Sequence, residues 1–279
     1  MDWLGGRRGG NIEARRGMSV GGLVGGGGIG AVVLAAVGYF VFGIDPSTTM
    51  QAVNAVQGQQ AQQQEGVRGT PQDRAAQFVD VIGSSNDDVW KQLIPDYTPP
   101  RSIVLYDQAT GTGCGMGQAA MGPFYCPGDQ RVYLDLSFWN ELETRYGAKG
   151  EFARAYVIAH EVGHHVQNLT GSMRNAQRGA GAEGGSVRTE LQADCYAGVW
   201  ASHAGQASGG AITINQADIE DGLGAAAAVG DDALQQKSQG QVQPDSFTHG
   251  SSAQRMRWFR VGYESGDPKD CDTFSARSL

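Results

Sequence analysis

Residues 151–169 read EFARAYVIAHEVGHHVQNL, and this stretch is the most informative part of the sequence about fold and function. Its apolar residues recur at helical spacing and Thr170-Gly171 closes it, so we predict a helix over residues 151–169. The helix contains the pattern HExxH at residues 160–164. Spacing of four residues places both imidazoles on one helix face, where they can reach a single zinc ion, with Glu161 over the metal's open side. The alternative is a buried pair of hydrogen-bonded histidines in a core helix.

A catalytic zinc site needs a third protein ligand beside His160 and His164, and an open position for water. We predict that this ligand is Glu190, in the stretch RTELQADCY. Asp194 follows four residues later on the same helix face, so it can accept a hydrogen bond from a ligating imidazole and fix its tautomer. The apolar flank of the two carboxylates favours a buried site over the alternative, a solvated acidic face. His165 is a weaker candidate ligand because it projects about 100° away from His164.

The combination of HEVGHH with ELQADCYAG some thirty residues later resembles the bacterial family of putative neutral zinc metallopeptidases, which are membrane-anchored proteins with one HExxH helix. It is more distantly similar to gluzincin-type membrane proteases, in which HExxH and ExxxD helices build the zinc site. Thr248-His249, with Arg255 six residues after the histidine, resembles the distal histidine and arginine of those proteases. Gly250 stands where they usually have proline. The resemblance covers roughly residues 70–275.

The expected function is zinc-dependent hydrolysis of peptide bonds. One zinc ion per chain, held by His160, His164 and Glu190, would lower the pKa of a bound water toward about 7. Glu161 would take the proton of this water as the water attacks a peptide carbonyl, and would then give it to the leaving amine. The expected partner is therefore a peptide or protein substrate.

Three further features extend this expectation. His249 is a candidate donor to the oxyanion that develops during the attack. Arg255 is expected to hold Asp194 or to support the fold. The predicted strand over residues 131–136 is a candidate edge along which an extended substrate pairs main chain to main chain.

A second pattern, over residues 21–44, predicts one transmembrane helix. No charged residue occurs from Gly17 to Ile44, and the uncharged run is long enough to cross a bilayer. Four arginines precede it, whereas no basic residue follows until Arg68, so the positive-inside rule predicts a cytoplasmic N-terminus over residues 1–20. The remainder would lie on the periplasmic or extracytoplasmic side of a bacterial inner membrane, in contact with the lipid bilayer through this single-pass helix.

The four cysteines all follow the predicted span. An even number of cysteines in an oxidising compartment is compatible with two disulfides. Loop closure favours Cys114 with Cys126 and Cys195 with Cys271, although four cysteines allow three pairings. Four buried or reactive thiols are the alternative.

The rest of the chain divides by composition. Residues 45–74 are Gln-rich and nearly free of large apolar groups, so we expect a flexible linker there, and a peptidase domain over residues 75–279. We predict strands over residues 101–106, 122–126 and 131–136. A first helix is predicted over residues 71–94, with an interruption at 83–86. Further helices are predicted over 138–146, 151–169, 186–204, 215–229 and 251–263. The expected fold class is α+β: a predominantly helical, zincin-like metallopeptidase domain with a small antiparallel sheet, preceded by one transmembrane helix.

The net charge of the chain and two alternative functions also have to be considered. The chain of 279 residues has a formal net charge of −8, which argues against nucleic acid as a partner. A catalytically silent, zinc-containing binding or chaperone-like module would have a closed metal site, with His165 or Asp194 in the water position. A membrane-tethered assembly protein would use the overlapping GxxxG spacings of residues 21–30 to pack against another helix.

Overall fold

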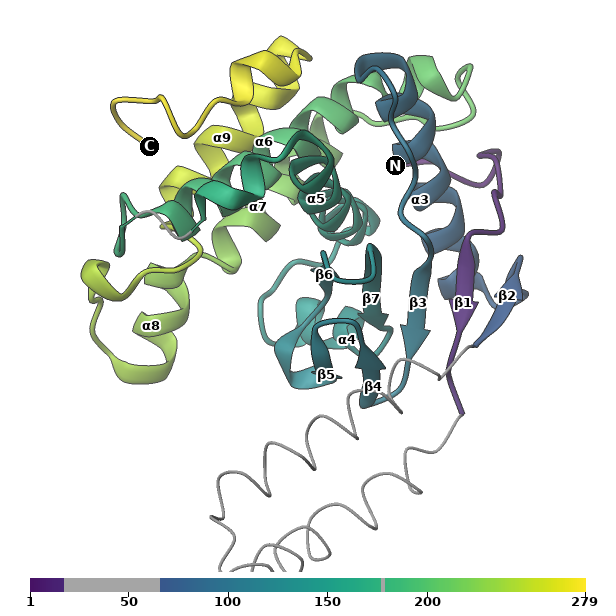
Figure 1. Ribbon diagram of the computed structural model, residues 1–279, viewed down its shortest axis with the longest axis horizontal. Helices are drawn as coiled ribbons and strands as arrows, with labels where there is room; N and C mark the ends of the chain where they lie inside the picture. Colours follow the sequence, from purple (N-terminus) through teal and green to yellow (C-terminus); the bar gives the residue numbers. More distant parts are fainter. Residues whose placement is uncertain (18–65, 177–178) are drawn as a thin grey trace, which may run out of the picture.

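The computed structural model describes residues 1–17, 66–176 and 179–279. In these ranges one mixed sheet lies below most of the helices in the view of Figure 1. The helices are α3 (Arg74–Leu93), α4 (Phe138–Thr144), α5 (Glu151–Thr170), α6 (Gly185–Ala207), α7 (Gln216–Ala228), α8 (Asp231–Gln239) and α9 (Ser252–Ser265). The described part is therefore α+β and predominantly helical, which confirms the predicted class. Helix α8 was not predicted.

The main sheet has five strands in the order β2-β1-β3-β7-β6. These strands are β1 (Ile12–Ala14), β2 (Val67–Gly69), β3 (Ile103–Tyr106), β6 (Phe124–Cys126) and β7 (Arg131–Asp135). Strands β1 and β7 run parallel to β3, and only the outer strands β2 and β6 are antiparallel to their neighbours. The predicted antiparallel pairing is confirmed for β6 and β7, but the sheet as a whole is mixed rather than antiparallel. Strands β4 (Ala109–Thr112) and β5 (Gly115–Gln118) form a separate antiparallel pair.

Strand β7 lies between β3 and β6, as Figure 1 shows. The expectation that residues 131–136 offer a free edge to a substrate is therefore wrong, because both edges of β7 are paired. Among the described residues the strand at this end of the sheet is β6. Alternation of apolar residues predicts a strand but does not reveal its neighbours, so the order had to come from the structure.

The N-terminal residues 1–17 belong to the folded domain. Strand β1 inserts between β2 and β3, and Trp3 packs edge-on against Phe78 of α3, with 5.1 Å between ring centroids. Glu13 is buried in the sheet, where it pairs with Arg15 at 2.7 Å and accepts a hydrogen bond from Ser102 at 2.9 Å. Residues 1–17 and 66–74 therefore belong to the same folded unit as the rest of the described chain.

The pairing of β1 also bears on the predicted membrane topology. The transmembrane helix predicted over residues 21–44 lies outside the described residues. Within them, no helix combines the length and the apolar character that a bilayer span requires. A single span would place residues 1–17 and 66–279 on opposite sides of the membrane, whereas the structure places them in one sheet. The pairing of β1 does not agree with a single span between these two parts of the chain, and the sidedness of the domain stays a prediction.

Helix α3 runs without a break through residues 83–86, where an interruption was predicted. The small polar residues there are buried and hydrogen-bonded. Ser85 accepts a hydrogen bond from Trp200 Nε1 of α6 at 3.1 Å, and Asn86 donates to the carbonyl oxygen of Ile82 at 2.9 Å. These hydrogen bonds hold the residues inside the core, where Asn86 Oδ1 is the one buried side-chain oxygen of this stretch without a partner, so the helix continues where the composition suggested a turn.

Both expected disulfides form. Cys114, between β4 and β5, is bonded to Cys126 at the end of β6. Cys195 of α6 is bonded to Cys271 in the short 3-10 helix Pro268–Cys271. The second bridge ties the C-terminal segment to the middle of α6, one residue after Asp194 and five residues after Glu190.

Candidate metal centre

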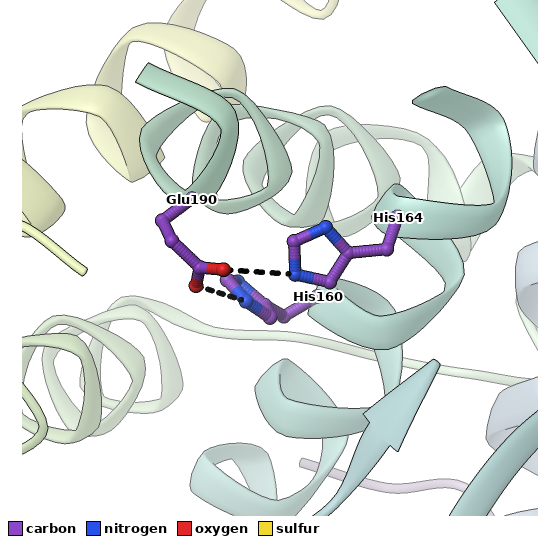
Figure 2. A group of neighbouring side chains, drawn as sticks. All are labelled: His160, His164 and Glu190. Carbon is purple, nitrogen blue, oxygen red and sulfur yellow. Dashed lines mark ion pairs between the residues drawn. The ribbon is translucent and has the colours of Figure 1, made fainter. Parts of the chain in front are cut away.

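Helices α5 and α6 approach closely beside the predicted ligands. A Cβ atom at Gly163 would lie 3.0 Å from the carbonyl oxygen of Ala193, so glycine inside the HExxH pattern permits this approach without displacement. The approach brings His160 and His164 of α5 opposite Glu190 of α6. Figure 2 shows the three side chains converging from the two helices.

The geometry of these three side chains fits a zinc ion. His160 Nε2 lies 3.3 Å from Glu190 Oε2, and His164 Nε2 lies 3.5 Å from Glu190 Oε1. The three ligand atoms all lie within 4.8 Å of one another. Two ligands held about 2.1 Å from a tetrahedral zinc ion are about 3.4 Å apart, so the observed spacing suits that metal. Three protein ligands also leave one tetrahedral position open.

Asp194 orients the first of these imidazoles. Its Oδ1 lies 2.8 Å from His160 Nδ1, and Arg255 of α9 contacts both carboxylate oxygens, at 2.8 and 2.9 Å. Burial alone would raise the pKa of Asp194, but the charges of Arg255 and His160 outweigh burial and hold this pKa below its usual range. The ionised carboxylate accepts the Nδ1 proton of His160, which leaves Nε2 for the metal.

Arg255 reaches this carboxylate because α9 packs directly on α6. A Cβ atom at Gly262 would lie within 1.9 Å of the carbonyl oxygen of Cys195, so the two backbones touch there. Ser251 and Gln254 cap the first turn of α9 reciprocally, which fixes the start of the helix one turn before Arg255. Arg255 is 4 % exposed, and its Nη2 also donates to the hydroxyl of Tyr156 at 3.2 Å.

The charges of the ligands and of Glu161 are set by burial and by one another. Burial would lower the pKa of His160, but Asp194 and Glu190 raise it to about 10, so zinc has to displace a proton there. Burial would raise the pKa of Glu190, but the two histidines outweigh it and lower this pKa. Burial raises the pKa of Glu161 despite the nearby histidines, so this carboxylate is a stronger base than an exposed one.

A cavity of about 490 Å³ opens at this site. Glu161, His249 and the three candidate ligands line it together. Apolar and aromatic side chains line much of the remainder, among them Met121, Phe124, Phe138, Val157, Met173 and Leu234. The arrangement combines a metal-binding group, a buried base and an apolar surface in one cavity.

His249 is held by a residue that the sequence patterns did not indicate. Asp231, the first residue of α8, lies 3.3 Å from His249 Nδ1 and accepts backbone hydrogen bonds from residues 248–250 at 2.6 to 3.0 Å. The hydrogen bond to Asp231 raises the pKa of His249 above its usual value. Gly230-Asp231-Asp232 is a helix-start signal that would have indicated α8, although not its contact with His249.

His165 is turned away from the metal-binding group. Its Nδ1 lies 3.0 Å from the hydroxyl of Tyr125, and its Nε2 lies 2.7 Å from the carbonyl oxygen of Thr98. Asp194 is likewise engaged with His160 and Arg255. Neither residue fills the fourth position, so the geometry of the described residues does not favour the closed site of a silent module.

Comparisons with known proteins relate the chain to a zinc peptidase family. A family model described as "Putative neutral zinc metallopeptidase" matches residues 1–274. The chain is 46 % identical over 296 residues to "Uncharacterized protein YpfJ" of Escherichia coli K12, with 98 % of this chain and 99 % of the relative covered. It is 54 % identical over 205 residues to "Uncharacterized protein Rv2575" of Mycobacterium tuberculosis, with 71 % of this chain and 70 % of the relative covered. No solved structure matches the chain.

The family match begins at residue 1, well before the residues 70–275 that the sequence motifs indicated. This extent agrees with the place of β1 inside the main sheet. The chain belongs to the putative neutral zinc metallopeptidase family.

Proposed function

We propose that this protein hydrolyses peptide bonds with a zinc ion held by His160, His164 and Glu190. The observation that carries the proposal is that three ligand atoms within 4.8 Å of one another share a cavity with the buried carboxylate of Glu161. Family membership supports a zinc peptidase in general. The convergence of the three side chains in one cavity supports the assignment of these residues as ligands.

Zinc, when bound, supplies a Lewis acid that polarises the peptide carbonyl and makes water a nucleophile near neutral pH. Glu161 accepts the proton of the attacking water, because burial makes its carboxylate a better base than an exposed one, and then returns that proton to the leaving amine. His249 lies in the same cavity and is fixed by Asp231, so it is placed to donate a hydrogen bond to the developing oxyanion.

We propose that the substrate lies along β6. This strand has no partner on its outer side in the order of the described sheet, and its residues Phe124 and Tyr125 line the cavity. An extended peptide can pair its main chain with such an edge, while the apolar walls of the cavity accept its side chains. This assignment replaces β7, the strand expected from the sequence.

Hydrolysis of a defined peptide mixture tests the proposed function. The purified full chain, loaded with zinc, is expected to generate new peptide termini that mass spectrometry detects. A chelator should abolish their formation, and added zinc should restore it, because the base and the oxyanion donor cannot act alone. Zinc-loaded protein that cleaves nothing in the mixture would contradict a peptidase and would favour the silent binding module.

We further propose that the domain lies on the extracytoplasmic side of a bacterial membrane, with the apolar residues 21–44 in contact with the bilayer. Two disulfides suit an oxidising compartment. Because β1 pairs with β2 and β3, residues 1–17 must lie on the same side as the domain.

Cysteine labelling in intact spheroplasts tests this sidedness. All four native cysteines are in disulfides, so a substituted cysteine is the single free thiol. Leu4 is 67 % exposed and Val242 is 40 % exposed, so both Leu4→Cys and Val242→Cys should react with a membrane-impermeant maleimide before lysis. Labelling of Val242→Cys alone would restore the single-pass topology. Labelling of neither before lysis would place the domain in the cytoplasm.

A further inference from the structure

Gln167 contacts the second candidate ligand, and the HExxH pattern assigns it no role. It lies three residues after His164 on α5, which places the two side chains on one helix face. Its side chain is completely buried, and its Oε1 lies 2.8 Å from His164 Nδ1. The contact therefore lies on the side of the imidazole opposite to the proposed metal.

The orientation of the Gln167 amide is fixed by its other contacts. Its Nε2 donates to the carbonyl oxygen of Thr189 at 2.7 Å and to Gln192 Oε1 at 3.1 Å. The carbonyl can only accept, and Gln192 uses its own Nε2 to donate to the carbonyl oxygen of Cys271 at 2.9 Å. A rotated Gln167 amide would set its oxygen against these acceptors. Oε1 therefore faces His164, and His164 must carry its proton on Nδ1.

We propose that Gln167 is a positioning residue for His164. By accepting the Nδ1 proton, its Oε1 fixes the tautomer and the ring orientation that leave Nε2 free to bind zinc. The two imidazoles are thus held by different partners, a carboxylate at His160 and a neutral amide at His164. The proposal rests on the ligand set assigned above but not on peptide hydrolysis, because zinc binding is measured directly.

The hydrogen bonds that support His160 and His164 both lead to the disulfide between Cys195 and Cys271. A series of hydrogen bonds runs from His164 through Gln167 and Gln192 and ends at the backbone carbonyl of Cys271. Cys271 is bonded to Cys195, which directly follows the Asp194 that holds His160. The outer ends of both supporting networks are therefore fixed to the same part of α6, and the amide chain has a defined polarity because its last acceptor is a carbonyl.

Zinc affinity of the full chain, measured by competition with a chromogenic chelator, tests the proposal. Gln167→Met has a similar volume but no hydrogen-bonding groups, and we expect it to raise the Kd for zinc by about 10- to 100-fold. Gln167→Glu keeps an oxygen opposite His164 Nδ1 but sets its second oxygen against the carbonyl oxygen of Thr189, so its zinc affinity is expected to lie between those of wild type and Gln167→Met. A zinc Kd for Gln167→Met within about threefold of wild type, or an equal loss in Gln167→Glu, would overturn the proposal.

Two controls separate positioning from stability. Asn86→Leu removes another fully buried amide, in α3, which makes one backbone hydrogen bond and no contact with the ligands. It should lower the free energy of unfolding of the zinc-free protein without changing the zinc Kd. The second control is an NMR spectrum of zinc-loaded wild type labelled with ¹⁵N-histidine, which does not depend on any variant folding. We expect this spectrum to show a solvent-protected Nδ1 proton on His164. An exchanging Nδ1 proton, or zinc on Nδ1, would contradict the proposal.

Discussion

Replacing Glu161 with glutamine is expected to lower kcat for peptide hydrolysis by roughly 10²- to 10⁴-fold and to leave zinc bound. Glutamine has nearly the same shape, but its amide cannot accept the proton that the attacking water releases. Glu161 contributes none of the three converging ligand atoms, so its replacement removes no bond to the metal. Loss of activity with retained zinc is the combination that identifies a general base.

Glu141→Gln is the matched control for this variant. Glu141 lies on α4 and lines the same cavity, but it is not part of the ligand group. It should keep kcat near the wild-type value. The measurement is kcat on one cleaved peptide together with the zinc content of the same samples. Turnover retained by Glu161→Gln would remove Glu161 as the base, and zinc lost from this variant would show that Glu161 supports the metal.

The sequence was most informative about the helices that carry the ligands. The HExxH spacing and the four-residue spacing of Glu190 and Asp194 are local, and helical periodicity alone places each pair on one face. The structure brings the two pairs together because Gly163 allows α5 and α6 to approach. The contact of Arg255 with Asp194 was one of two roles left open for that arginine.

The sequence was least informative about contacts between distant segments. Strand β1 lies far from β3 in the chain, and the uncharged stretch between β1 and β2 suggested a boundary rather than two neighbouring strands. The neighbours of β7 could not be predicted either, because alternation of apolar residues carries no information on strand order. Asp231 reaches His249 from α8, and helical spacing places Gln167 beside His164 without showing which group it contacts, so neither hydrogen bond could be predicted.

Glu190→Ala is expected to have the largest effect on zinc. It removes the only ligand that α6 contributes and leaves two imidazoles, which are too few for the tetrahedral catalytic sites that zinc forms in proteins. The apolar side chain also leaves His160 and His164 without the carboxylate that both now contact. We expect the zinc affinity to fall by at least about 100-fold, more than for Gln167→Met, because a ligand rather than its partner is lost.

Glu183→Ala provides the control, because Glu183 precedes α6, pairs with Arg188 at 3.1 Å and lies outside the ligand group. The most direct test is the zinc content of the purified, dialysed full chain, measured by elemental analysis for wild type and both variants. About one zinc per chain is expected in wild type and in Glu183→Ala, and almost none in Glu190→Ala. Wild type without zinc, or Glu190→Ala with as much zinc as wild type, would contradict the assignment of His160, His164 and Glu190 as the metal centre.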